Sequence, residues 1–265
     1  MTDTKANNAE SRSTPQLTEE VALRLADTIA ATLDKACKAS PGKPASKEAK
    51  KLAAQRVLKK VIDYDLLEAY PLVIWDEIIT VVDRILAYPV TTLYRRHLKD
   101  APKEILSAWQ IHSQSLRVGE IYIIQDRTSA LLKFLYQVAS DAGIPATNYE
   151  KKFEKEFKKA FERRLRERHR LVHAHERQSL ESRIISLSGA ARPDKEQLEK
   201  ILTDILTDII PILTDVMTKQ NREPPQSMDD VAALHEQGAV REAAEMLDLV
   251  GAALLRTLNL LPAAP

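Results

Sequence analysis

Glycine is scarce in this sequence, and this scarcity constrains the fold more than any other feature. Only 6 of the 265 residues are glycine. Proteins built from β-sheets use glycine in tight turns and at bulges, so a count this low favours long helices over strands. A chain of this length can also bury a sizeable core. The sequence therefore predicts an all-α protein of one or two domains.

Apolar residues recur with the period of an α-helix along most of the chain. The segments with this pattern that we expect to form the core lie near 71–88, 116–141, 149–177 and 194–218. Helices of this length joined by short connections pack as neighbours that run in opposite directions. We therefore expect an antiparallel helical bundle, with extra helices at the N-terminal and C-terminal sides.

Polar and proline-containing stretches divide the chain into four parts. Residues 1–16 are polar and predict a disordered tail, and residues 17–62 predict a helical extension. The bundle of core helices follows, and the family resemblance described below implies that it spans 65–218. Residues 227–260 predict a helical hairpin that is hinged near Gly238.

Local signals also mark the junction between two of the core helices. Gly143, with Pro145 just beyond it, predicts the end of the helix at 116–141. Thr147 and Glu150 have the T-x-x-E spacing of a capping box, which predicts the start of the next helix.

That next helix carries an aromatic stripe that leads into a cluster of basic residues. Phe153, Phe157 and Phe161 recur every fourth residue, and the stretch RERHRLVHAHER follows at 166–177. On a continuous helix the apolar stripe would reach Arg168. An arginine on a buried line is costly unless its charge finds partners, so Arg168 is a candidate ligand-binding residue.

A metal site is one interpretation of the histidines in this stretch. His169 and His173 have the i, i+4 spacing with which two imidazoles can share an ion. However, the general-base glutamate of an H-E-x-x-H motif is missing between them, and Arg168 and Arg170 would repel a divalent cation. We therefore expect no metal ligand here, and no nucleotide-cofactor motif occurs in the sequence.

A basic face is a second interpretation. Residues 150–170 contain ten lysines and arginines against five glutamates. Many of these charges can pair along an exposed helix, but the surplus leaves a face that could follow the phosphates of a nucleic acid. The expected nucleic-acid-binding residues are Lys158, Arg164, Arg166, Arg170 and His175.

The segment RHRLVH at 168–173 resembles the signature of HEPN (higher eukaryote and prokaryote nucleotide-binding) domains. That signature has an arginine, a polar residue, a short spacer with apolar residues and then a histidine. HEPN domains are small antiparallel helical bundles with this motif late in the bundle, which agrees with the predicted order of helices. Arg170 and His175 form a second pair with the same spacing.

The resemblance implies a metal-independent endoribonuclease. His173 would transfer a proton at the scissile phosphate, Arg168 would bind that phosphate, and His169 would orient the substrate or the other histidine. The products would be a 2′,3′-cyclic phosphate and a 5′-hydroxyl. Many HEPN domains act as toxins or as effectors of defence against phage, which implies a cognate antitoxin or a regulatory protein as a partner.

The helical geometry bears on the oligomeric state. Within one helix Arg168 and His173 lie about 140° apart, so they converge only if the helix bends or if two copies meet. HEPN domains often form a homodimer in which both motifs line one cleft, and we expect the same here. The alternatives are a non-catalytic helical module that binds RNA or protein, and a structural bundle whose outer hairpins mediate oligomerisation.

Charge, cysteine content and hydropathy bear on the partners and the cellular compartment of the protein. The net charge is +1, so attraction to RNA must come from a local patch, and the single cysteine excludes a disulfide scaffold within one chain. The sequence has neither a secretory signal nor an apolar run of membrane-spanning length. We expect a cytoplasmic protein without a membrane partner.

Overall fold

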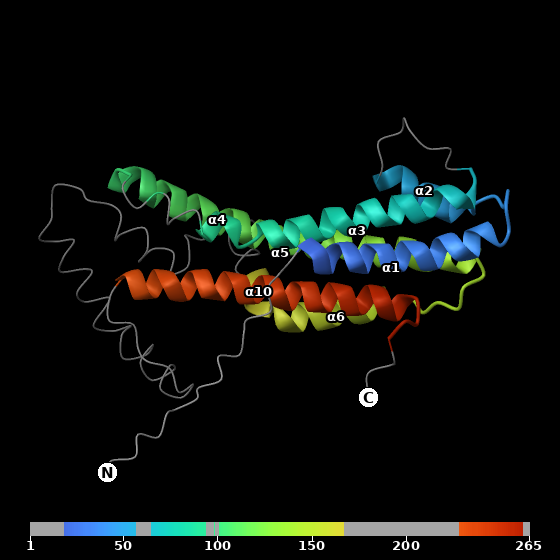
Figure 1. Cartoon of the computed structure of the whole chain (residues 1–265). Helices are drawn as coiled ribbons and strands as arrows, with labels where there is room; N and C mark the ends of the chain where they lie inside the picture. The colour runs from blue at the N-terminus through green and yellow to red at the C-terminus, as the bar shows by residue number, and fades with distance from the viewer. Residues whose placement is uncertain (1–18, 57–64, 94–97, 99–100, 167–227, 262–265) are drawn as a thin grey trace, which may run out of the picture.

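The computed structural model describes residues 19–56, 65–93, 98, 101–166 and 228–261 (Figure 1). Within these ranges all regular structure is helical and there is no strand, which confirms the predicted all-α class. The helices are α1 (Glu19–Lys38), α2 (Lys47–Arg56), η1 (Leu67–Ala69, a 3₁₀ turn), α3 (Tyr70–Ala87), α4 (Val90–Leu93), α5 (Lys103–Asp141), α6 (Glu150–Ala160) and α10 (Met228–Thr257).

The long helices form an elongated bundle. Helix α3 packs between α1 and α5, while α6 and α10 pack against each other and against α5 (Figure 1). The core is a continuous cluster of buried aliphatic and aromatic side chains. Its largest fully buried members include Ile29, Leu33, Ile74, Ile78, Ile124 and Phe134. Such burial is the main stabilising contribution to a bundle of amphipathic helices.

The junction after α5 is built as its sequence predicts. Gly143 has a φ of 76°, a left-handed conformation that is open to glycine at little cost. The N–H of Ile144 donates to the carbonyl of Ala139 at 2.9 Å, which closes the helix with a Schellman-type bond. Helix α5 itself begins at Lys103 rather than near residue 116, and at 39 residues it is about 58 Å long.

The predicted capping box at the start of α6 is wrong. The hydroxyl of Thr147 donates to Oδ1 of Asn259 at 3.0 Å instead of capping α6. The backbone N–H of Thr147 donates to the carbonyl of Thr257 at 2.9 Å. Thr147 therefore docks the loop before α6 onto the end of α10, because a tertiary partner competes with the local cap.

The expected division into a bundle and outer extensions is also wrong for α1 and α10. Both helices contribute fully buried residues to the same core cluster as α3 and α5. The hairpin at 227–260 is a single helix that continues through Gly238. One glycine inside a helix costs only about 1 kcal/mol, and the packing of α10 from Ala239 onwards offsets it. The predicted helix at 194–218 lies outside the described residues.

Candidate nucleic-acid interface

One face of α6 is anchored in the core. Phe153, Phe157 and Phe161 are buried, with exposed fractions of 0%, 0% and 3%. Adjacent ring centroids in this series lie 5.4 and 4.6 Å apart, close enough for the aromatic rings to contribute beyond their buried area. The predicted phenylalanine stripe is therefore confirmed up to Phe161.

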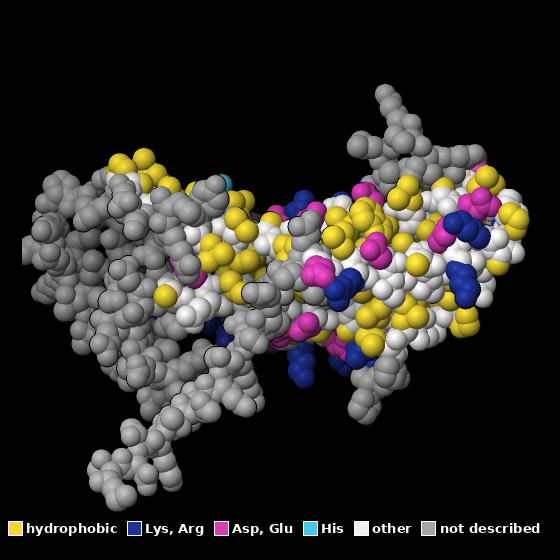
Figure 2. Space-filling view, in the orientation of Figure 1, with side chains coloured by type: hydrophobic (Ala, Val, Ile, Leu, Met, Phe, Trp, Pro, Cys, Tyr) yellow, Lys and Arg dark blue, Asp and Glu magenta, His cyan; other side chains and the backbone are white. Residues whose placement is uncertain are grey.

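The opposite face of α6 and of the turn after it is basic. Lys155, Lys158, Lys159 and Glu162 recur at spacings of three and four residues, and all four are exposed. Figure 2 shows lysine and arginine side chains projecting from the molecule in the region of α6. No carboxylate in the described part of the chain forms an ion pair with any of the three lysines.

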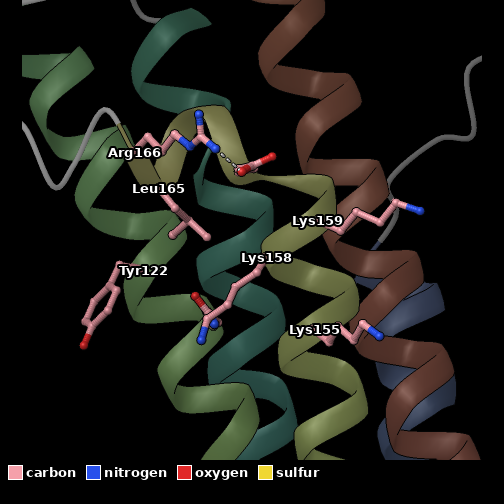
Figure 3. Close-up of a pocket in the computed structure, with 8 residues that line it drawn as sticks. Tyr122, Lys155, Lys158, Lys159, Leu165 and Arg166 are labelled. Carbon is pink, nitrogen blue, oxygen red and sulfur yellow. Dashed lines mark hydrogen bonds and ion pairs between the residues drawn. The ribbon is translucent and has the colours of Figure 1, made fainter.

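An open groove of about 650 Å³ runs along this basic face between α5 and α6. Three lysines and one arginine line the groove against a single glutamate. In Figure 3, Lys158 and Leu165 extend toward α5, Lys155 and Lys159 extend from the other side of α6, and the ring of Tyr122 lies at the outer edge of α5. The lining residues are Tyr122, Gln125, Lys155, Lys158, Lys159, Glu162, Leu165 and Arg166.

The helix that carries these residues is not straight. Phe161 has φ −110° and ψ 22°, which ends α6, and helical structure resumes over 162–166. The expected uninterrupted helix from 149 to 177 is thus broken before the basic stretch. The N–H of Leu165 still donates to the carbonyl of Phe161 at 3.0 Å. Because of the break, α6 alone does not fix the direction of 162–166.

Arg164, an expected RNA-binding residue, faces a carboxylate on α10. Its Nε donates to Oε1 of Glu242 at 2.9 Å, and its side chain is 22% exposed. The other oxygen of Glu242 accepts from the Tyr88 hydroxyl at 2.5 Å and from Nη2 of Arg117 at 2.8 Å. We call Tyr88, Arg117, Arg164 and Glu242 the carboxylate cluster.

The electrostatics of this cluster favour an ionised Glu242. Burial alone would raise the pKa of the carboxyl group, but Arg164, the Tyr88 hydroxyl and Arg117 outweigh burial and hold the pKa below its usual value. Burial raises the pKa of Tyr88, so its hydroxyl stays a donor at neutral pH. The guanidinium of Arg117 also lies 5.0 Å from the centroid of the Tyr88 ring.

The structure places only part of the predicted site. Lys158 and Arg166 line the groove, and Arg166 forms an ion pair with Glu162. Arg164 belongs to the carboxylate cluster. The candidate catalytic residues Arg168, His169 and His173, and the candidate RNA-binding residues Arg170 and His175, lie outside the described residues.

Sequence reasoning missed two features of this region. Tyr122 is 41% exposed. It falls in register with Asp126 and Lys133 on the polar side of α5, a pattern that could have flagged an exposed aromatic residue. Glu242 could not have been found in this way, because it meets Arg164 across 78 positions of sequence.

Comparisons with known proteins do not assign this site to a family. No known protein family, no curated protein and no solved structure matches the chain significantly. In the described ranges, no group of three or more histidine, cysteine, aspartate or glutamate side chains could hold a metal ion. A search of the same residues finds no helix that is both long and apolar enough to span a membrane.

Proposed function

We propose that this protein binds RNA along the basic groove between α5 and α6. The observation that carries the proposal is the composition of the groove, whose lining contains four cations and one carboxylate. Lysine and arginine side chains attract the phosphates of a nucleic acid and release its condensed counterions. Since the whole chain has a net charge of only +1, this local concentration of positive charge supports a specific binding surface rather than general attraction to polyanions.

The two walls of the groove suit different parts of a polynucleotide. Lys155, Lys158 and Lys159 can follow the phosphates along α6. Tyr122, on α5, presents an aromatic ring on which an unpaired base can stack. Leu165 adds an apolar contact between these two walls. Phosphate contacts and stacking are together the usual means by which proteins hold single-stranded RNA.

We further propose that the bound RNA is cleaved, as the resemblance to HEPN domains implies. RHRLVH begins at Arg168, two residues after the groove residue Arg166. The candidate catalytic motif therefore follows the groove residues directly in the sequence. In this proposal Arg168 binds the scissile phosphate, His173 transfers a proton and His169 orients the substrate. The 2′-hydroxyl of RNA is the nucleophile, so no metal is required.

The proposal extends to the assembly and the cellular role. A homodimer would bring Arg168 of one copy close to His173 of the other, which overcomes their angular separation on one helix. By the same resemblance, the ribonuclease would act in the cytoplasm as a toxin or a phage-defence effector under the control of an antitoxin or a regulatory protein.

RNA binding is tested by charge reversal in the groove. The affinity of the full chain for a labelled single-stranded RNA is measured from 50 to 200 mM salt by fluorescence anisotropy. In the triple variant Lys155→Glu, Lys158→Glu, Lys159→Glu we expect much weaker binding and a salt slope that is smaller by about 2, since each phosphate contact contributes roughly 0.7. The matched control reverses the exposed residues Lys35, Lys47 and Lys51 of α1 and α2. Equal affinity of the two triple variants would refute the groove as the RNA site.

Cleavage is tested separately, in EDTA. The Arg168→Ala and His173→Ala variants should each lose cleavage of the labelled RNA but keep the affinity that the lysines provide. If the active site is shared between two copies, mixing the two inactive variants should restore part of the activity. Wild-type protein that binds RNA without cleaving it would leave the binding module as the function.

A further inference from the structure

The break at Phe161 raises the question of what sets the direction of residues 162–166. This short segment carries Leu165 and Arg166, which line one end of the groove. Its backbone bond from the N–H of Leu165 ends on the carbonyl of Phe161, the residue of the break, and does not reach α6 itself. A non-helical residue at this point allows the segment to leave α6 in more than one direction. Leu165 packs against the core cluster and holds one side of the segment, and a directional contact from another element is needed to fix its orientation.

The carboxylate cluster supplies that contact. Arg164 lies in the middle of the segment, and its Nε bonds to Glu242 of α10 at 2.9 Å. Glu242 is itself fixed, because its other oxygen accepts bonds from Tyr88 at the end of α3 and from Arg117 of α5. The Arg117 side chain is only 5% exposed, so the carboxylate is held by a rigid part of the core. Charge-assisted bonds of this kind are strong and directional.

We propose that Glu242 is a positioning residue, which acts through Arg164 to set the direction of residues 162–166 and so to shape the Arg166 end of the RNA groove. The expected effect of Glu242 on RNA binding rests on the proposed function, whereas its effect on the direction of residues 162–166 does not. Glu242 touches no RNA in this proposal. It holds the arginine that orients its neighbours.

The substitution Glu242→Gln separates positioning from simple electrostatics. All three partners of the carboxylate donate to it, so the amide nitrogen of glutamine faces either Arg164 or the pair Tyr88 and Arg117, and at least one contact to an arginine is lost. The substitution also removes a negative charge from a basic region. By electrostatics alone it should strengthen RNA binding. Positioning requires the opposite, a weaker complex.

The experiment combines two measurements on the full chain. The first is affinity for the labelled single-stranded RNA, and the second is amide hydrogen exchange of peptides that cover 162–166. For Glu242→Gln we expect about tenfold weaker RNA binding. We also expect about tenfold faster exchange of the segment, with α1 and α3 unchanged. Arg164→Lys, which keeps the charge but loses the Nε donor, should show smaller changes in the same direction.

The matched control is Glu120→Gln. Glu120 also accepts two bonds from an arginine, Arg84, at 2.9 and 3.1 Å, but this pair joins α3 to α5 and includes no residue of the 162–166 segment. In Glu120→Gln, the amide exchange over 162–166 and the RNA affinity should equal those of the wild type. Urea unfolding of each variant verifies that it is folded under the assay conditions.

Each result of these measurements either supports the proposal or overturns it. Weaker binding and faster exchange in Glu242→Gln, together with an unchanged control, support the proposal. Unchanged exchange over 162–166 overturns it, as does RNA binding by Glu242→Gln as tight as that of the wild type. If the wild type binds no RNA, the proposed function fails, and the exchange measurement alone decides whether Glu242 positions the segment.

Discussion

The two faces of residues 150–166 solve different physical problems. The phenylalanine face is buried against the core, where packing determines both the contribution to stability and the conformation of each side chain. The lysine face is exposed, and its cations make no ion pair with a described carboxylate, so it contributes little to folding. Arg164 differs from both faces, because it is charged but partly buried and bonds to Glu242 of α10. The contrast teaches that the stability of the fold and the charge of its exposed surface can be changed separately in this helix.

The largest effect on stability is expected from the buried face. Phe157→Ala removes a fully buried ring that contacts two neighbouring phenylalanines, and it should destabilise the protein by about 4 kcal/mol. Urea unfolding measures this difference. Lys158→Ala, one residue further on the exposed face, is the control and should change the stability by less than about 0.5 kcal/mol. Similar losses in the two variants would erase the distinction between the faces.

The carboxylate cluster should come next, with a dependence on pH. The pKa of Glu242 is lower in the folded than in the unfolded protein, so its contribution is present above its unfolded pKa near 4.5 and is lost as the pH falls through the folded value. Glu242→Gln should cost about 2 kcal/mol at pH 7, less than for a fully buried pair because the side chain is 19% exposed. Thermal unfolding between pH 7 and pH 3 should show this difference shrinking in acid. If the stability difference between the wild type and Glu242→Gln stays constant from pH 7 to pH 3, the lowered pKa of Glu242 is contradicted.

A smaller effect, on RNA binding rather than on folding, is expected at Tyr122. If a base stacks on this ring, Tyr122→Ala should weaken binding about tenfold, whereas Tyr122→Phe should retain most of the affinity. Anisotropy with the same single-stranded RNA measures both variants. A loss of affinity in the phenylalanine variant equal to that in the alanine variant would show that the hydroxyl, and not the aromatic face, makes the contact.

The smallest effect is expected at the ion pair between Glu162 and Arg166. Both side chains are largely exposed, at 60% and 74%, and exposed pairs one helical turn apart contribute about 0.3–0.5 kcal/mol. Glu162→Gln should therefore leave the unfolding midpoint almost unchanged. It should also strengthen RNA binding slightly, since it frees Arg166 and removes the one carboxylate that lines the groove. Weaker binding would mean that Glu162 orients Arg166 for the ligand.

Patterns that depend on near neighbours could be predicted from the sequence. The phenylalanine stripe and the helix end at Gly143 follow from helical period and from glycine's freedom at positive φ, and the structure confirms both. The single cysteine, Cys37, is buried, and burial together with Asp34 and Glu68 raises its pKa to about 11. The thiol is therefore protonated at neutral pH.

Features set by distant partners could not be predicted. Thr147 has the spacing of a capping residue but bonds to Asn259, which the sequence gives no reason to place nearby. Gly238 resembles a hinge only until the burial of α10 is known. In the candidate site, the basic face followed from counting charges. The break at Phe161 and the anchoring of Arg164 depend on how α10 packs, which no local pattern encodes.

The bond between Arg164 and Glu242 also has a consequence for biosynthesis. The two residues are 78 positions apart, and at ordinary rates of translation that distance takes about 4–16 s to synthesise. During this interval α6 and its lysines exist without the carboxylate that orients the segment after them. The groove between α5 and α6, which this segment lines at one end, therefore takes its final shape only after α10 has left the ribosome and docked.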